Sequence, residues 1–227
     1  MTQMQTARRI WASPTRPFTL TEVIADGVVH VVGIVAAIAI GSIILAFAFM
    51  QTAPKEAPAL TVYLVSLLAV LSVSLAYNLS PVSPIKSWLA RFDQAAIFLF
   101  IAGTYTPFLA IMGGSTTTIL LGSFVWGASI VGIALKLIVP ERFGRLAIVL
   151  YLAIGWSGVA VFQSLGATLP ATTLWLLLAG GVVYSAGIIF HLWERLKFQN
   201  VLWHVFVVAG AMLHLVAILN CVVISRL

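Results

Sequence analysis

The chain has 227 residues, of which 62% are hydrophobic and 8% are charged, and its mean hydropathy is +1.12. Soluble domains carry about a quarter charged residues, so this composition excludes an ordinary soluble protein and predicts an integral membrane protein. Twelve Lys and Arg outnumber six Asp and Glu. The basic residues are spread over short loops, which argues against a nucleic-acid-binding face. The single cysteine, Cys221, excludes an intramolecular disulfide framework.

Seven stretches are long and apolar enough to cross a bilayer, which takes about 20 residues. They are residues 29–50, 59–79, 94–112, 117–139, 146–165, 172–191 and 201–224. Proline- and glycine-containing breaks separate them. We therefore predict an all-α integral membrane protein, a seven-transmembrane helix bundle. It would form a single membrane domain over residues 22–227, preceded by a cytoplasmic N-terminal segment, residues 1–21. That segment lacks the apolar core of a cleavable signal, so the first span is expected to direct insertion.

The distribution of basic residues predicts the orientation of the bundle. Ten of the twelve Lys and Arg fall on one side of the predicted spans, and only Lys55 and Arg226 fall on the other. The ten are Arg8, Arg9, Arg16, Lys86, Arg91, Lys136, Arg142, Arg145, Arg195 and Lys197. Basic loops stay in the cytoplasm, so we expect a cytoplasmic N-terminus and a C-terminus outside.

Polar residues within or at the ends of the spans gather on this cytoplasmic side. They are Glu22, Asp26 and His30 leading into the first span, Ser74 and Asn78 at the inner end of the second, Asp93 at the start of the third, His191 at the end of the sixth, and Asn200 and His204 at the start of the last. Ionisable groups inside a membrane are costly and mark functional sites by default. Their shared depth in several helices favours one common polar site.

Each of these residues also has a simpler explanation when it is taken alone. Glu22 and Asp26 could be solvated residues of an interfacial helix, and Asp93 could be a helix N-cap. A lone His204 is more often hydrogen-bonded structure than a ligand. The common depth, rather than any single residue, carries the prediction of a site.

Several motifs resemble those of the haemolysin III family. They are Ser74-Leu-Ala-Tyr77-Asn78, Arg91-Phe-Asp93-Gln94-Ala-Ala-Ile, Ala102-Gly103-Thr104-Tyr105-Thr106-Pro107, Gly181-Val-Val-Tyr184-Ser-Ala-Gly187, and Asn200-Val-Leu-Trp203-His204. The resemblance covers residues 22 to about 218. That family belongs with the progestin and adipoQ receptors and is more distantly similar to alkaline ceramidases. The resemblance implies the same seven-helix architecture, in a bacterial inner (plasma) membrane with lipids as partners.

The resemblance also implies a zinc site that this chain has altered. In the family pattern, a serine is followed four residues on by a histidine and fifteen later by an aspartate, and the last helix carries two histidines four apart. The three histidines hold zinc, and the serine and aspartate assist the water that zinc activates. Ser74, Asp93 and His204 match this pattern, whereas Asn78 and Asn200 stand where two ligand histidines are expected.

A neutral amide oxygen is a poor ligand for zinc, so the resemblance implies either no metal or a weakly bound one with His204 as a ligand. Asp26 or His30 could be recruited, or a hard cation could replace zinc, and the spacing does not choose between them. The alternative is a metal-free hydrogen-bonded network of the same shape.

Two functions follow from these alternatives. The first is a non-enzymatic membrane protein of the haemolysin III type that affects membrane properties or energetics, with pore-forming, cytolytic activity implied by the resemblance. The second is a metal-dependent hydrolase of a lipid amide, in which Asp93 accepts a proton from water and Ser74 steadies the oxyanion. A receptor for an extracellular ligand is disfavoured, because the outer loops are too short to form a binding domain.

Overall fold

The computed structural model describes residues 18–51, 56–140 and 144–227, so Arg8, Arg9, Arg16, Lys55 and Arg142 lie outside the described residues. The long helices are α2 (Leu20–Gln51), α3 (Glu56–Leu79), α4 (Pro84–Met112), α5 (Thr116–Ile138), α8 (Ala171–Leu192) and α9 (Gln199–Val222). Between α5 and α8 lie α6 (Gly144–Gly155), a 3-10 turn η2 (Ser157–Val161) and α7 (Phe162–Thr168), and a second 3-10 turn, η3 (Ile224–Arg226), follows α9. Seven helical segments of the described chain are long and apolar enough to cross a membrane, which confirms the predicted fold class.

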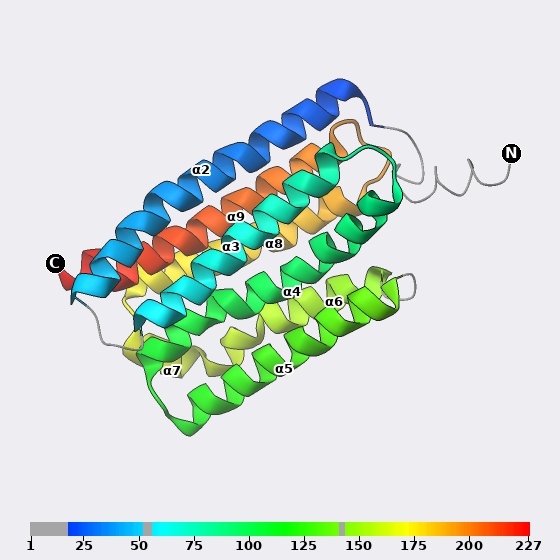
Figure 1. The fold of residues 1–227 in the computed structure, drawn as a ribbon. Helices are drawn as coiled ribbons and strands as arrows, with labels where there is room; N and C mark the ends of the chain where they lie inside the picture. The colour runs from blue at the N-terminus through cyan, green and yellow to red at the C-terminus, as the bar shows by residue number, and fades with distance from the viewer. Residues whose placement is uncertain (1–17, 52–55, 141–143) are drawn as a thin grey trace, which may run out of the picture.

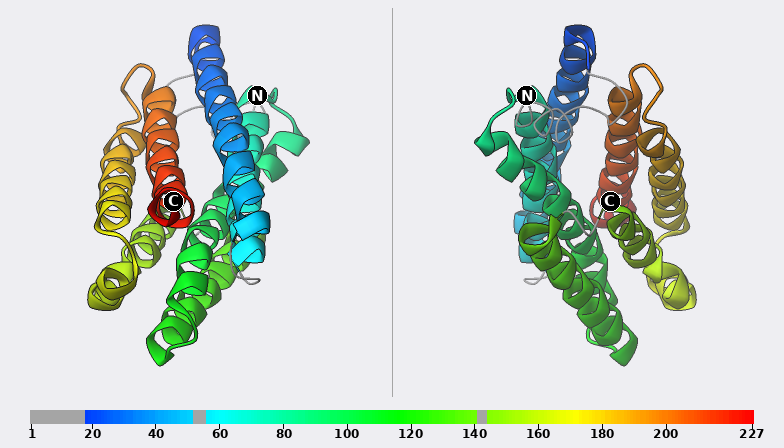
Figure 2. Two further views of the ribbon diagram at one scale, coloured as in Figure 1. Left: turned by 90° about the vertical axis from the view of Figure 1, so that its left-hand side faces the viewer. Right: turned by 90° about the vertical axis from the view of Figure 1, so that its right-hand side faces the viewer.

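The helices run up and down in one bundle (Figure 1). One end of the bundle holds the first residues of α2, α4, α6 and α9 together with the last residues of α3, α5 and α8. We call it the α2-start end. Helix α2 packs against both α3 and α9, α3 packs against α4, α4 against α5, and α8 against α9. The first and last long helices are therefore neighbours, which Figure 2 shows from two sides.

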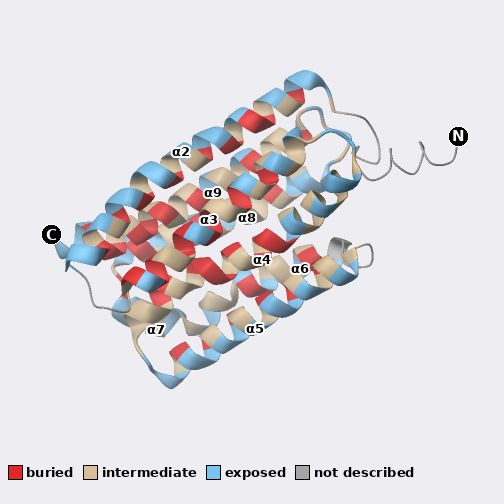
Figure 3. Ribbon diagram, viewed as in Figure 1, coloured by how far each residue is buried: buried red, intermediate tan, exposed pale blue. Residues whose placement is uncertain are grey.

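Buried residues face the interior of the bundle and exposed residues lie on its outside (Figure 3). The interior contains large side chains such as Tyr63, Phe98, Leu67 and Leu215, all fully buried. Large exposed apolar side chains on α2, α5 and α8 include Val35, Phe124 and Trp175. Such an apolar exterior suits a lipid environment, where packing and polar contacts rather than the hydrophobic effect hold the helices together.

Two helices begin about ten residues earlier than the sequence analysis predicts, because their N-terminal caps lie in polar stretches. At α2, the Glu22 backbone N–H donates to Thr19 Oγ1 (3.3 Å) while Thr19 N–H donates to Glu22 Oε2 (2.9 Å), which is a capping box. At α4, Ser83 Oγ accepts the Lys86 N–H at 3.2 Å and Pro84 occupies the first turn. The prediction that Asp93 opens the third span was therefore wrong, since it lies well inside α4.

The predicted span 146–165 is interrupted after Gly155, where α6 gives way to η2. Tyr105 of α4 satisfies the backbone at this break: its hydroxyl lies 2.7 Å from Gly155 O and accepts the Gly158 N–H at 2.9 Å. Backbone that leaves a helix at membrane depth is tolerated only where protein groups or water replace its hydrogen bonds. A side chain distant in sequence does so here, which hydropathy does not reveal.

The α3–α4 contact depends on a glycine. A Cβ atom added at Gly103 would lie 2.8 Å from Ser66 Cβ, below any normal contact distance. We predict that Gly103→Ala lowers the free energy of unfolding by about 1–3 kcal/mol, because overpacking forces the helices apart. Thermal unfolding in detergent measures this. Gly127→Ala is the matched control, since nothing lies within 4 Å of its added Cβ, and equal melting of both variants would contradict the prediction.

Candidate functional site

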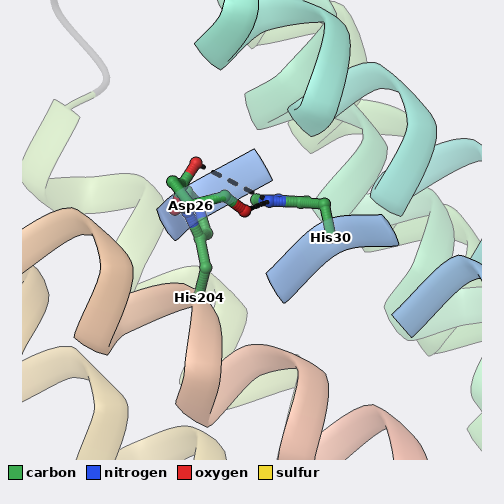
Figure 4. A group of neighbouring side chains, drawn as sticks. All are labelled: Asp26, His30 and His204. Carbon is green, nitrogen blue, oxygen red and sulfur yellow. Dashed lines mark hydrogen bonds and ion pairs between the residues drawn. The ribbon is translucent and has the colours of Figure 1, made fainter. Parts of the chain in front are cut away.

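Asp26 is the centre of a buried polar cluster near the α2-start end. Asp26 and His30, one turn further along α2, are each 1% exposed, and His204 of α9 is 7% exposed. His204 Nδ1 lies 2.5 Å from Asp26 Oδ1, and His30 Nδ1 lies 3.6 Å from Asp26 Oδ2. Figure 4 shows His204 reaching from α9 toward the two α2 residues. We call Asp26, His30 and His204 the α2–α9 triad.

The triad leaves one strong acceptor without a partner. Asp26 Oδ2 is a buried oxygen with no hydrogen-bond donor, while Oδ1 pairs with His204. The two imidazole rings meet edge to face, with centroids 4.5 Å apart. A buried carboxylate requires a positive partner or a full set of hydrogen bonds, since an unpaired buried charge is very costly. The carboxylate therefore has capacity for a further cation or donor.

A chain of amides and a hydroxyl lies beside the triad. Asn200 Nδ2 of α9 donates to Asn78 Oδ1 of α3 at 3.1 Å. Asn78 Nδ2 in turn donates to the Ser74 carbonyl at 2.9 Å and reaches Ser74 Oγ at 3.4 Å. The two asparagines thus bond to each other across two helices, as a neutral polar link between α3 and α9.

Ser74 and Asp93 are neighbours, as the motif spacing implies. The Ser74 side chain lies near enough to the carboxylate of Asp93 to stabilise it, and that carboxylate also lies near enough to His204 and Asp26 to interact with them electrostatically. Asp93 itself is half-buried. The structure therefore gathers Ser74, Asn78 and Asp93 with Asn200 and the triad, from the four helices α2, α3, α4 and α9.

Glu22 belongs to a different set of contacts from the triad. Besides capping α2 through Thr19, its Oε1 accepts the backbone N–H of Phe198 at 2.7 Å. Phe198 has φ 61°, a left-handed conformation that is strained for a residue with a side chain. Glu22 thus fixes the turn from which α9 starts and so sets the position of His204. Sequence analysis grouped Glu22 with Asp26 and His30; the Thr19-x-x-Glu22 capping pattern is the signal that separates it.

The remaining residue of the predicted polar group, His191, does not join the triad. It is exposed, its ring contacts that of Trp203 at a tilt with centroids 4.9 Å apart, and its carbonyl accepts Gln199 Nε2–H at 3.1 Å. Lys136, predicted to lie around the end of the span 117–139, is in the last turn of α5, where it is buried and its Nζ donates to Gln94 Oε1 at 2.7 Å.

The fit of the family's zinc set can be tested on these contacts. Asn78 and Asn200 stand at positions that the resemblance assigns to two of the three ligands; Asn200 donates to Asn78, and His204 turns its Nδ1 to Asp26. An amide pair offers neutral oxygens, which zinc disfavours. The three-histidine set is therefore absent from these positions, whereas the triad offers two imidazoles and a carboxylate with an unpartnered oxygen, a donor set that zinc does accept.

Fold and site together define a seven-helix membrane protein with a buried carboxylate–imidazole cluster near one end of its bundle. Residues 18–215 match the family described as Haemolysin-III related, and the chain belongs to that family. It is 33% identical over 195 residues to the Hemolysin-3 homolog of Bacillus subtilis (strain 168), which covers 86% of this chain and 91% of that protein.

Two further relatives extend the comparison. The chain is 33% identical over 190 residues to Hemolysin-3 of Bacillus cereus, covering 84% of this chain and 87% of that protein. It is 28% identical over 127 residues to the human Monocyte to macrophage differentiation factor, covering 56% and 52%. No solved structure gives a significant match.

Removing the Glu22 carboxylate tests its role in positioning α9. We predict that Glu22→Ala lowers the free energy of unfolding by about 1–3 kcal/mol, because it leaves the Phe198 and Thr19 N–H groups without acceptors. Glu22→Gln keeps one acceptor oxygen and should lose less. Thermal unfolding in detergent measures both, and wild-type melting of Glu22→Ala would contradict this role.

Proposed function

We propose that this haemolysin III-related chain lies in a bacterial cytoplasmic membrane with its N-terminus inside, binds a cation at the α2–α9 triad, and thereby affects membrane properties or energetics. The observation that carries the proposal is Asp26, a residue that is 1% exposed and whose carboxylate has one oxygen without a hydrogen-bond donor. Ionisable residues at this depth in a membrane mark ion or substrate sites.

Charge supports the proposed orientation. Lys86 and Arg91 in the first half of α4, and Arg195 and Lys197 between α8 and α9, belong to the α2-start end, where the triad also lies. Basic residues near membrane ends stay in the cytoplasm. The cation site would then be near the cytoplasmic side of the bilayer, with the lipids around the bundle as its immediate partners.

A non-enzymatic role is supported by the chemistry of the amide pair. Asn78 and Asn200 satisfy each other across α3 and α9 and take up the positions from which two histidines would hold a catalytic zinc. A satisfied polar link of this kind stiffens a bundle rather than activating water.

The names of the bacterial relatives describe haemolysins, so lysis is a property to test in this chain as well. The described interior is filled by large side chains, including Tyr63 and Phe98, which are fully buried. A pore would require these packed helices to separate or several copies to assemble. We therefore propose an effect on ion movement without release of larger solutes.

Reconstitution in vesicles separates these outcomes. We predict that the wild-type chain speeds the decay of an imposed potassium diffusion potential several-fold over empty vesicles, while an entrapped fluorescent dye is retained. Asp26→Asn should abolish the effect, because it removes the buried charge that attracts the cation, and Glu56→Gln, at the opposite end of the bundle, should not.

Two results would contradict the proposal. Dye release by the wild-type chain would establish a lytic pore instead. An unchanged potential decay, or one that Asp26→Asn leaves intact, would remove the link between the triad and membrane energetics.

A metal-dependent lipid amide hydrolase is a second candidate, favoured by the Ser74–Asp93 pair beside His204. In this reading Asp93 would accept a proton from water and Ser74 would donate a hydrogen bond to the developing oxyanion. We predict that any ceramide hydrolysis by the purified chain falls at least about a hundredfold in Asp93→Ala, as expected for loss of a general base. Release of fatty acid in mixed micelles measures it, and activity that survives Asp93→Ala would contradict these roles.

A further inference from the structure

The α2–α9 triad presents three metal-ligating side chains from two helices. We propose that Asp26, His30 and His204 bind one divalent transition-metal ion of the zinc class. This inference rests on the proposed cation site and deepens it by naming the ion and its ligands. The ligand set differs from the three histidines that the family resemblance implies, and shares only His204 with them.

The spacing of the donor atoms suits such an ion. One ligand atom from each residue lies within 4.8 Å of the others, and the shortest pair, His204 Nδ1 to Asp26 Oδ1, is 2.5 Å apart. Ligands at about 2.0–2.2 Å from a tetrahedral ion lie roughly 3.4 Å from one another. The observed separations bracket that value, so side-chain rotations rather than helix movements would complete the site.

The hydrogen bonding of His30 prepares it to be a ligand. Its Nδ1 lies 2.9 Å from the backbone oxygen of Asp26. Because a carbonyl oxygen can only accept a hydrogen bond, the His30 Nδ1 must carry the hydrogen. In the neutral ring, Nε2 then has a free lone pair for a metal ion. Metal-ligating histidines commonly donate their second nitrogen to a backbone carbonyl in this way, which fixes the ring and its tautomer.

The local charges also suit a divalent ion. Two carboxylates lie near His204: Asp26 Oδ1 is 2.5 Å from its Nδ1, and Asp93 is near enough to interact with both residues electrostatically. Two negative charges and a divalent cation sum to zero, which removes much of the cost of burying each of them. The ion would also give Asp26 Oδ2 the partner it lacks. An Asp–His ion pair alone satisfies only one of the two carboxylate oxygens.

Metal content tests this assignment directly. The detergent-purified full chain is loaded with zinc, freed of excess ion, and analysed by mass spectrometry. We expect about one zinc per chain in the wild type. Asp26→Asn and His30→Gln should bind zinc at least about tenfold more weakly, because losing a ligand weakens metal affinity no less than losing a residue that hydrogen bonds a ligand. His191→Asn is the matched control: it removes an exposed imidazole near the same end of the bundle and should retain zinc.

Cobalt(II) provides a second readout that does not depend on the variants folding. Bound to the wild-type chain at a low-symmetry site with imidazole ligands, it should show visible absorption stronger than that of aqueous cobalt. Size-exclusion profiles report whether each variant is folded. Failure of the wild type to bind zinc or shift the cobalt spectrum, or equal zinc binding by wild type, Asp26→Asn and His30→Gln, would overturn the assignment.

A variant with restored histidines separates the two ligand sets. Asn78→His with Asn200→His rebuilds the three-histidine pattern around His204, so zinc binding should then survive Asp26→Asn. Without the two added histidines, Asp26→Asn should lose zinc. If Asp26→Asn keeps zinc both with and without them, the proposal is overturned. The vesicle measurement is independent: a potential decay that needs Asp26 in a chain without zinc would retain the proposed function and reject only this ion.

Discussion

Burial of the Asp26 carboxylate against His204 joins the first long helix to the last, and the arrangement of the site depends on it. In a bilayer, a charge cannot be left to solvent, so its partner must come from a neighbouring helix. Here that partner lies on α9, 178 residues away along the chain. The pair fixes the depth of α2 relative to α9 and brings His30 to the same place, so the contact that holds the helices in register also builds the candidate site.

The same constraint explains the polar contacts elsewhere in the bundle. The Glu22 carboxylate accepts the backbone N–H of Phe198, in the strained turn from which α9 begins. Where α6 ends, the Tyr105 hydroxyl hydrogen bonds the backbone on both sides of the break, at Gly155 O and Gly158 N–H. At the break after α6, a side chain from another helix replaces backbone hydrogen bonds that a continuous helix would make, as membrane depth requires. At Phe198, a side chain from α2 bonds the backbone of the turn before α9. Each contact therefore stabilises a local irregularity and aligns two helices.

Composition and hydropathy were sufficient to predict seven helices, since apolar length alone identifies a span. They misplaced the starts of α2 and α4, because the capping groups Thr19 and Ser83 lie in polar sequence outside the apolar windows. That error placed Asp93 at a helix end rather than inside α4. The motif spacing did identify the group of Ser74, Asp93 and His204. The pairing of Asp26 with His204 was beyond the sequence, because periodicity gives the face of a helix but not the neighbour it meets.

The direction of the His204 ring decides which ligand set this fold can use. Asn200 lies one turn before it on α9 and faces Asn78, so histidines at these two positions would draw His204 toward α3. With amides there, Asn78 and Asn200 bond each other, and the His204 Nδ1 bonds Asp26 instead. A three-histidine site and the α2–α9 triad would both need His204, and one imidazole cannot complete both with the same nitrogen. The two asparagines therefore bond each other across α3 and α9 while His204 bonds α2, and the charge of Asp26 favours that orientation of the imidazole.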